Sequence, residues 1–284
     1  MKRIGPFRLL CFLLAFSVIP LPAKAAQNTA ASQVSNILLV GRDDYAGTDR
    51  CRSDSIILCT FHAGSNKLTM TSILRDLYVP IPGHRNNRIN AAYALGGMEL
   101  LEQTVEETFD ITLDGSAVVD FTRFPQLIDL LGGVTLELRA DEAEAINHRF
   151  PGSAQEGLCR LNGDQALAYV RIRKLDDDGD FSRTDRQRKL LQALLDAYRN
   201  ATLPQILQLL PEALSLVETN MDKRQLMKTV KTVLPALPSL QVTQQHIPAP
   251  GTYRYRTLRG MCVLVADLDA AKNLLQQTIS PPQE

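Results

Sequence analysis

Three apolar runs early in this 284-residue chain limit its fold more than any other feature. Ile37–Val40 is a continuous apolar run closed by Gly41, which is typical of a strand covered on both faces. Ser55–Phe61 and Leu68–Ile73 also have strand character, and residues 62–66 between them have the chemistry of a hairpin turn. The pattern predicts that the three runs are neighbouring strands of one sheet.

Helical spacing then alternates with strand-like segments. Apolar residues recur at helical spacing over Ala91–Phe109, and a second helix is expected from Thr122 to Leu131. Strand character returns at Val118-Val119 and at Val134–Leu138, on either side of that second helix. The alternation predicts an α/β fold in which a central mixed β-sheet is sandwiched between helices, an α-β-α arrangement. Roughly 250 residues without an internal repeat fit a single domain.

The second half of the chain continues the same pattern. Asn162 followed by Gln165 is typical of a helix cap and opens a helix at Asp164–Val170, and a longer helix is expected from about Thr184 to Arg199. Beyond Pro204 the pattern shows two more segments with periodic apolar residues. Strands are then expected at Leu240–Thr243 and Met261–Val265, and a last helix at about Leu268–Gln277. We expect a core at residues 35–200 and a C-terminal part, 201–284, that completes the same domain.

The first 25 residues have the pattern of an export signal. Basic residues precede an apolar run from Leu9 to Ile19, and Ala23-Lys24-Ala25 supplies the small residues of a cleavage site. The apolar run is too short to span a bilayer, which needs roughly 20 residues. We therefore expect a signal peptide over residues 1–25, cleaved after Ala25, with a retained membrane anchor as the alternative and 26–34 as a linker. The protein is then exported to the outer face of the cytoplasmic membrane or the cell wall.

Charge and cysteine content narrow the kind of protein. The leader holds four basic and no acidic residues, so the remaining chain has a net charge of about −4, which gives no reason to expect nucleic-acid binding. Export permits disulfides, and the cysteine spacing matches no zinc pattern. We expect a disulfide between Cys159 and Cys262, which would tie the C-terminal strand to the rest; Cys51 and Cys59 are the weaker pair.

Two carboxylates border neighbouring strands. Asp43 follows the first apolar run, and Asp54 stands at the start of the second. Carboxylates at adjoining strand ends can converge on a hard cation, and magnesium commonly takes one or two protein carboxylates together with phosphate oxygens and water. The alternative is an ordinary solvated acidic loop.

Arginines recur near the same strand ends. Arg75 follows the third strand, and Arg88 precedes the helix that begins near Ala91. The guanidinium group is a planar fork of donors that suits phosphate oxygens. Each of these arginines, taken singly, is more often a surface residue than a ligand.

A polar patch continues the apolar stripe of the helix expected from Thr184. Arg183 and Gln187 lie seven and three residues before Leu190 of that stripe, and Arg186 sits beside them. Inward-facing arginines are costly unless an anion or a polar cavity receives them, although these residues could also be a solvated face. Arg171 and Arg173, at the end of the preceding helix, could reach the same cavity.

These residues fall into an ordered series that resembles the motifs of LytR-CpsA-Psr proteins. The most specific pair is Leu161–Tyr169 together with Asp180–Gln187. The resemblance covers roughly residues 35 to 200. The other motifs that carry it are Asn36–Asp43, Arg52–Asp54, Ser72–Asp76, Arg88–Tyr93, Asp120-Phe121, Leu131–Val134 and the remainder of Leu161–Arg173 and Asp178–Lys189.

The resemblance implies a phosphotransferase of cell wall biogenesis. It would move an anionic glycopolymer, such as a teichoic acid or capsular polysaccharide, from an undecaprenyl-pyrophosphate carrier at the membrane surface to peptidoglycan. By the resemblance, Asp43 and Asp54 hold a metal, Mg²⁺ or Mn²⁺, and act in catalysis with Arg75. The pyrophosphate would be bound by Arg52, Arg75, Arg88, Arg171, Arg173, Arg183, Arg186 and Gln187. Two rival functions are a pyrophosphatase that acts on the lipid carrier and a non-catalytic, lipid-binding regulator of the envelope.

Overall fold

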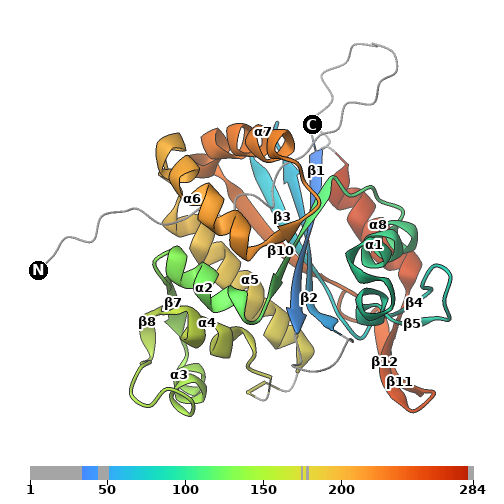
Figure 1. The fold of residues 1–284 in the computed structure, drawn as a ribbon. Coiled ribbons are helices and arrows are strands. Elements are labelled where there is room, and N and C mark those ends of the chain that lie inside the picture. The colour runs from blue at the N-terminus through green and yellow to red at the C-terminus, as the bar shows by residue number, and fades with distance from the viewer. Residues whose placement is uncertain (1–33, 44–50, 174, 177–178, 281–284) are drawn as a thin grey trace, which may run out of the picture. The chain divides into compact units, whose positions relative to one another are not determined.

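A computed structural model describes residues 34–43, 51–173, 175–176 and 179–280 (Figure 1). The chain divides into two compact units. Within the described residues, the sheet unit comprises 34–118 and 219–280, and the helical unit comprises 119–218. No helix in these ranges combines the length and the hydrophobicity needed to cross a membrane.

The sheet unit is built on long, mostly buried strands. The main sheet has the order β10-β3-β2-β1-β6-β9. β1 and β2 are antiparallel, as are β2 and β3, whereas β10 runs parallel to β3, so the sheet is mixed. Its strands are β1 (Val34–Asp43), β2 (Arg52–His62), β3 (Lys67–Ile73), β6 (Gly115–Asp120), β9 (Glu218–Thr219) and β10 (Gln241–Ile247). The α/β class with a central mixed sheet is confirmed.

The three apolar runs are neighbouring strands, as predicted. Nearly every residue of β2 is buried, because side chains on both of its faces are covered. A turn at 63–66 joins β2 to β3, and Asn66 there has a φ of 49°, a left-handed conformation that asparagine tolerates better than most residues. β10, from the C-terminal segment, lies beside β3. The domain boundaries expected from the sequence stay predictions.

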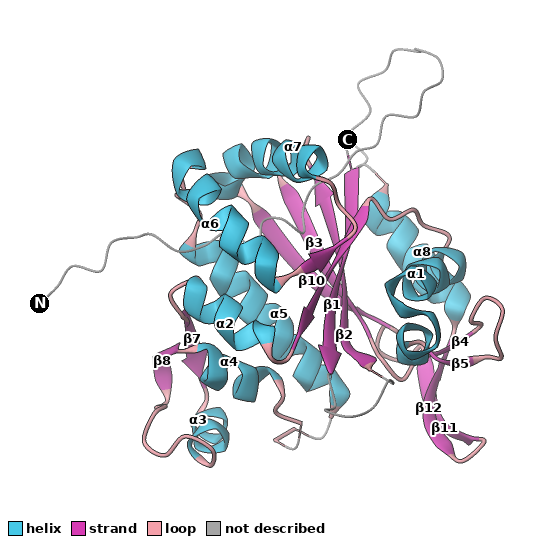
Figure 2. Ribbon diagram, viewed as in Figure 1, coloured by secondary structure: helices cyan, strands magenta, loops and turns pink. Residues whose placement is uncertain are grey.

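Helices and small hairpins complete the sheet unit. Figure 2 shows α1 (Asn90–Phe109) beside α8 (Leu268–Ile279), and α1 also packs on β2. α1 is kinked at Gly96-Gly97, where Gly97 has a φ of 68°. The remaining elements are β4 (Tyr78–Val79), β5 (Asn87–Arg88), α7 (Lys223–Val233), the 3-10 helix η2 (Leu234–Ser239), β11 (Tyr253–Leu258) and β12 (Met261–Ala266).

The helical unit is organised around α4, which packs against α2, α3 and α5. Asn162 caps α4: its side chain accepts a hydrogen bond from the Gln165 backbone at 3.0 Å, and Gln165 Oε1 accepts one from the Asn162 backbone at 2.8 Å. The capping pair predicted from the sequence is therefore confirmed. The elements are α2 (Arg123–Leu130), β7 (Val134–Leu138), α3 (Ala140–Asn147), β8 (Gly157–Leu161), α4 (Gly163–Val170), α5 (Asp180–Ala197) and α6 (Leu203–Leu216).

Two details of this unit differ from the prediction. α5 begins at Asp180 rather than near Thr184, and its first turn buries Phe181 and Arg183. β7 pairs with β8 in a separate two-stranded sheet.

The expected disulfide between Cys159 and Cys262 is not formed. Both are free thiols, Cys159 buried and Cys262 exposed. Cys159 lies opposite Leu136 in the β7–β8 hairpin, and Cys262 lies opposite Thr257 in the β11–β12 hairpin. The two cysteines thus belong to different small sheets in different units. The sequence pattern placed both near core elements but could not reveal these strand pairings.

Candidate functional site

A β-bulge shapes the end of β1 and the start of β2. The register passes from Gly41 opposite Ser55 to Arg42 opposite Ser53, so Asp54 is the extra residue of β2. A bulge of this kind bends the strand and turns one side chain away from the regular alternation. Asp43, one residue further along β1, lies opposite Arg52. Asp43 and Asp54, the two residues expected to hold a metal, therefore lie at the same end of this strand pair.

The redirected Asp54 carboxylate meets Arg75. Nη1 of Arg75 donates to Oδ1 of Asp54 at 2.7 Å, and only 18% and 11% of these two side chains are exposed. Nε of Arg75 lies 3.6 Å from Oδ2 of Asp76, whose Oδ1 accepts a hydrogen bond from Nη1 of Arg88 at 2.9 Å. Two arginines and two aspartates thus alternate in one cluster, which we call the strand-end cluster.

The backbone fixes the segments that carry the strand-end cluster. The Asn90 N–H donates to the Arg75 carbonyl at 3.2 Å, and the Ile89 N–H donates to the Leu77 carbonyl at 2.8 Å. Arg88 lies opposite Tyr78 in the β4–β5 pair. These contacts hold Arg88 beside Arg75 although the two are thirteen positions apart in the chain.

Several buried polar atoms of this region are unsatisfied. Within the part of the chain that the structure describes, Ser53 Oγ, Arg88 Nε and Asn90 Oδ1 have no hydrogen-bond partner. Leaving such atoms buried and unpaired costs about 1–3 kcal/mol each. A ligand that brings oxygen acceptors for Arg88, and a cation or a donor for Asn90, would remove that cost. The cluster therefore suits a phosphate-bearing ligand.

Sequence reasoning missed two contacts here. Asp76 belonged to a recognised motif but was given no role, and the structure places it between Arg75 and Arg88. Arg42 donates through Nη1 to the Tyr93 hydroxyl at 3.2 Å, which ties the end of β1 to α1. Neither partner could be chosen from sequence spacing.

The helical unit contains its own arginine cluster. Arg186 is 4% exposed, and its Nε donates to Oε1 of Glu142, also 4% exposed, at 2.8 Å. Its Nη2 pairs with Asp176, which also accepts from Arg139 at 2.9 Å. Two carboxylates therefore hold the guanidinium of Arg186. Glu142 lay outside the motif series, and nothing in its spacing pointed to Arg186.

The other arginines of α5 are buried as well. Arg183 is 2% exposed, and its Nη2 lies 3.1 Å from Oδ2 of Asp180. Arg188 pairs with Asp185, and burial lowers the pKa of Arg188. Gln187 is half-buried. Of the two interpretations of this polar patch, the inward-facing one holds for Arg183 and Arg186, and both arginines have carboxylate neighbours.

The end of α4 carries two exposed arginines. Arg171 lies over the ring of Phe121, with 4.6 Å between the guanidinium carbon and the ring centroid. Arg173 is exposed. The Tyr169 hydroxyl is buried without a hydrogen-bond partner among the described residues, and burial raises the pKa of Tyr169 well above its ordinary value.

The metal site expected at Asp43 and Asp54 would rest on two carboxylates. Across the described ranges, no group of three or more His, Cys, Asp or Glu side chains is placed to hold an ion. Two carboxylates completed by phosphate oxygens and water are still a normal magnesium environment. The metal and ligand roles inferred from the sequence stay predictions.

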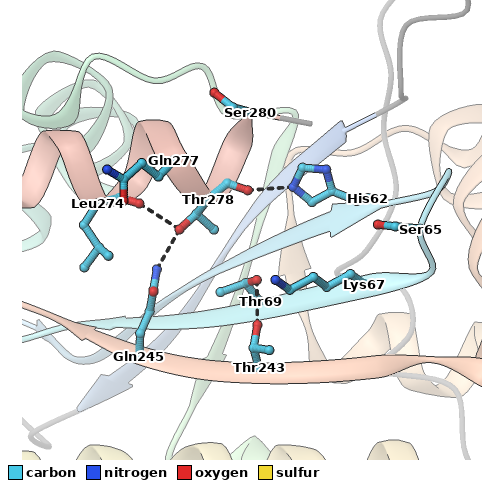
Figure 3. Close-up of a pocket in the computed structure, with 10 residues that line it drawn as sticks. All are labelled: His62, Ser65, Lys67, Thr69, Thr243, Gln245, Leu274, Gln277, Thr278 and Ser280. Carbon is cyan, nitrogen blue, oxygen red and sulfur yellow. Dashed lines mark hydrogen bonds between the residues drawn. The ribbon is translucent and has the colours of Figure 1, made fainter. Parts of the chain in front are cut away.

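A polar pocket of about 310 Å³ lies at the other end of β2 and β3 (Figure 3). His62, at the end of β2, lies with one ring nitrogen, Nε2, 2.6 Å from the Thr278 carbonyl oxygen. Gln245 of β10 donates to the Thr278 hydroxyl at 3.0 Å. Among the residues that the structure describes, no carboxylate lines this pocket. It opens far along the strands from Arg75 and is separate from the strand-end cluster.

Comparison with known proteins gives a consistent result. The sequence profile of the LytR_cpsA_psr family matches residues 21–279. The polyisoprenyl-teichoic acid–peptidoglycan teichoic acid transferase TagU of Oceanobacillus iheyensis is 41% identical over 167 residues, 57% of this chain and 50% of the relative. The regulatory protein MsrR of Staphylococcus aureus is 40% identical over 161 residues, 56% of this chain and 47% of the relative. This chain spans about half the length of the curated relatives it matches.

Solved structures resemble the fold over most of its length. The LytR-CPS2A-psr family protein YwtF (TagT) with bound octaprenyl pyrophosphate lipid has a TM-score of 0.67 and 26% identity. That match covers 98% of this chain and 98% of the other.

Proposed function

The chain belongs to the LytR-CpsA-Psr family, and we propose that it transfers an anionic glycopolymer from a polyprenyl-pyrophosphate carrier to peptidoglycan. The strand-end cluster is the observation that carries this proposal. Arg75 and Arg88 are held side by side by two aspartates, in a region with unsatisfied buried polar atoms. Support also comes from the TagU relative, named as a teichoic acid transferase, and from the TagT structure with its bound polyprenyl pyrophosphate.

The proposed reaction is a phosphoryl transfer. A peptidoglycan hydroxyl oxygen attacks the phosphorus that carries the glycopolymer, and the bond from that phosphorus to the bridging oxygen of the pyrophosphate breaks. The hydroxyl loses its proton, and polyprenyl phosphate leaves. Catalysis of this type depends on positioning and on stabilising charge, which arginine forks do well. Arg75 and Arg88 would bind the phosphate oxygens in this scheme.

Asp43 and Asp54 would hold a Mg²⁺ or Mn²⁺ ion in this scheme. Both carboxylates lie at the bulged end of β1 and β2, and oxygen ligands are what such ions prefer. A bound ion would offset the negative charge of the pyrophosphate. We propose further that the chain acts outside the cytoplasmic membrane, where the leader-like sequence and a lipid-linked substrate would place it.

Transfer of radiolabelled glycopolymer from its lipid carrier, with and without peptidoglycan, tests the proposal. We expect a peptidoglycan-linked product that depends on the acceptor. Release of free glycopolymer phosphate at the same rate without acceptor would instead identify a pyrophosphatase. If the lipid binds without any turnover, with metal present, the protein is a binding or regulatory protein.

Substitutions of Arg75 test whether its guanidinium group binds the phosphate. Arg75→Ala should lower the transfer rate about ten- to a hundredfold, because a charged hydrogen bond contributes about 1.5–3 kcal/mol. Arg75→Lys should recover little, since an ammonium group lacks the fork. Arg85→Ala is the matched control, because Arg85 is exposed on the loop between β4 and β5, three residues before Arg88. An equal loss in this control would remove the specific role of Arg75.

The response of the transfer rate to added magnesium distinguishes the role of Asp43 from that of Asp54. Added magnesium should restore much of the rate of Asp43→Ala. It should restore less for Asp54→Ala, because Asp54 also orients Arg75 through the 2.7 Å hydrogen bond. Arg75→Ala should show no rescue. If all three variants respond alike to metal, the assigned roles are wrong.

A further inference from the structure

The β11–β12 hairpin has an unusual surface. Its strands are paired from Tyr253 opposite Ala266 to Leu258 opposite Met261. Arg259 and Gly260 form the tight turn, with φ values of 52° and 73°. Figures 1 and 2 show the hairpin extending away from the other elements of the sheet unit. Seven of its fourteen residues are exposed, namely Arg254–Thr257, Arg259, Gly260 and Cys262.

The hairpin is strongly basic. It carries three arginines and no aspartate or glutamate over residues 253–266. Arg254, Arg256 and Arg259 are all exposed, and none forms an ion pair with a residue that the structure describes. Neighbouring like charges repel, so the folded hairpin gains nothing from holding these arginines together. Their arrangement suits an anionic partner.

Aromatic and apolar side chains accompany the arginines. Tyr255 is 55% exposed and packs edge-on against Tyr253, with 5.9 Å between ring centroids and an interplanar angle of 85°. Leu258 and Met261 face each other at the tip, and both are only half-buried. Tyrosine and arginine with an apolar tip are typical of segments that lie at a membrane–water interface. A soluble polyanion would satisfy the arginines but would gain nothing from the apolar tip.

The root of the hairpin adjoins the strand-end cluster. The Leu264 N–H donates to the Asp76 carbonyl at 2.9 Å, and Leu264 forms a parallel bridge with Leu77. Asp76 in turn binds Arg88 and lies next to Arg75 in the chain. With a rise of about 3.4 Å per residue, the turn lies roughly 14 Å from this root. The root of the hairpin thus lies beside Asp76 and Leu77, in the segment that carries the cluster.

We propose that the β11–β12 hairpin docks on the surface of an anionic lipid bilayer. The arginines bind lipid phosphates, the tyrosines lie at headgroup level, and Leu258 and Met261 enter the acyl boundary. Docking would hold the strand-end cluster near the headgroups, where the pyrophosphate of a lipid-linked substrate emerges. That last consequence rests on the proposed function, whereas docking itself does not.

Vesicle co-sedimentation of the full chain tests the docking. Vesicles of phosphatidylglycerol and phosphatidylcholine in equal parts are compared with phosphatidylcholine alone. Removing three charges in R254S/R256S/R259S should weaken binding to the anionic vesicles about a hundredfold, from the contribution of each arginine near such a surface. The control K223S/R224S/K231S removes three exposed charges from α7 and should bind nearly as well as the parent. Equal losses in both triple variants would overturn the proposal.

The apolar tip distinguishes a bilayer from a soluble polyanion. Leu258→Ser should weaken vesicle binding without any change in charge, and it should leave binding to soluble polyphosphate unchanged. If Leu258→Ser has no effect on vesicles, or if polyphosphate binds as tightly as the vesicles do, the hairpin is not a membrane-docking element. Thermal unfolding checks that each variant is folded.

The assay also separates this proposal from the proposed function. Transfer from a detergent-solubilised substrate should keep its rate in R254S/R256S/R259S, because no bilayer is needed there. Vesicle binding that survives in the absence of any transferase activity would support the hairpin and reject the enzyme.

Discussion

Replacement of Glu142 should destabilise the helical unit strongly. Glu142 and Arg186 are each 4% exposed and lie 2.8 Å apart, so neither charge is well solvated. Glu142 also accepts a hydrogen bond from the Arg139 N–H at 3.1 Å, which caps α3. Glu142→Gln keeps an acceptor for this cap but removes the charge that faces Arg186. Glu142→Ala removes both.

The expected magnitude follows from burial. Removing one partner of a buried ion pair typically costs 3–5 kcal/mol, because the other charge is left buried. Asp176 still pairs with Arg186 and is 23% exposed, so we expect about 3 kcal/mol for Glu142→Gln, the low end of that range. For a domain of 150–250 residues this lowers the melting temperature by about 6–12 °C. Glu142→Ala should lose about 1 kcal/mol more through the cap.

Urea unfolding followed by circular dichroism measures the change in the free energy of unfolding. The matched control is Glu144→Ala, an exposed position on the same helix, which should change stability by less than about 0.5 kcal/mol. The double variant Glu142→Gln/Arg186→Met should recover part of the loss, since replacing both charges removes the unpaired guanidinium. If Glu142→Gln costs no more than Glu144→Ala, the pair does not stabilise the protein and this reasoning fails.

Three further predictions concern local structure. Gly163→Ala would place a Cβ 2.0 Å from the Pro125 carbonyl oxygen, and we expect a loss of at least about 1–3 kcal/mol in thermal unfolding. The Asp222 carboxylate caps α7 by accepting two backbone hydrogen bonds. Asp222→Ala should therefore lower the free energy of unfolding in urea by about 1 kcal/mol. Burial raises the pKa of Glu102, so the protonated side chain favours the folded state. Its contribution to stability is fully present below pH 4.5, the ordinary pKa, and is lost as the pH rises through the raised pKa. Urea titrations over this pH range should show the loss in the parent and not in Glu102→Gln.

Elements with a strong local signal could be predicted from the sequence. The strands at 37–40, 55–61 and 68–73 were found because their apolar runs are continuous and a turn separates two of them. The cap of α4 was found because Asn162 and Gln165 contact each other within one turn. Pairing between distant segments carries no such local signal. The partnership of β7 with β8, and the separation of Cys159 from Cys262, depended on that pairing and were missed.

In the candidate site, too, the sequence identified residues within motifs but not their partners on distant segments. The motifs placed Asp54 and Arg75 near one sheet edge, and the structure joins them by a hydrogen bond. Asp76 and Glu142 were not given roles, because their arginine partners lie on other segments and are fixed only by tertiary packing. Spacing left open whether the α5 arginines face inward or form a solvated face; the structure buries Arg183 and Arg186, and the carboxylates that receive them could not be chosen from spacing.

The two arginine clusters differ in how readily an anion could engage them. In the strand-end cluster, Arg75 and Arg88 are 18% and 21% exposed, and water can compete for their carboxylate partners. These groups are less desolvated than Arg186 and Glu142, so a pyrophosphate could take over the two guanidinium groups at a lower cost than it could take over Arg186. Arg186 is buried between Glu142 and Asp176, and separating it from Glu142 would leave a desolvated carboxylate. Binding of an anion at Arg75 and Arg88 would therefore disturb the fold less than binding at Arg186, which pairs with Glu142 and Asp176 inside its unit.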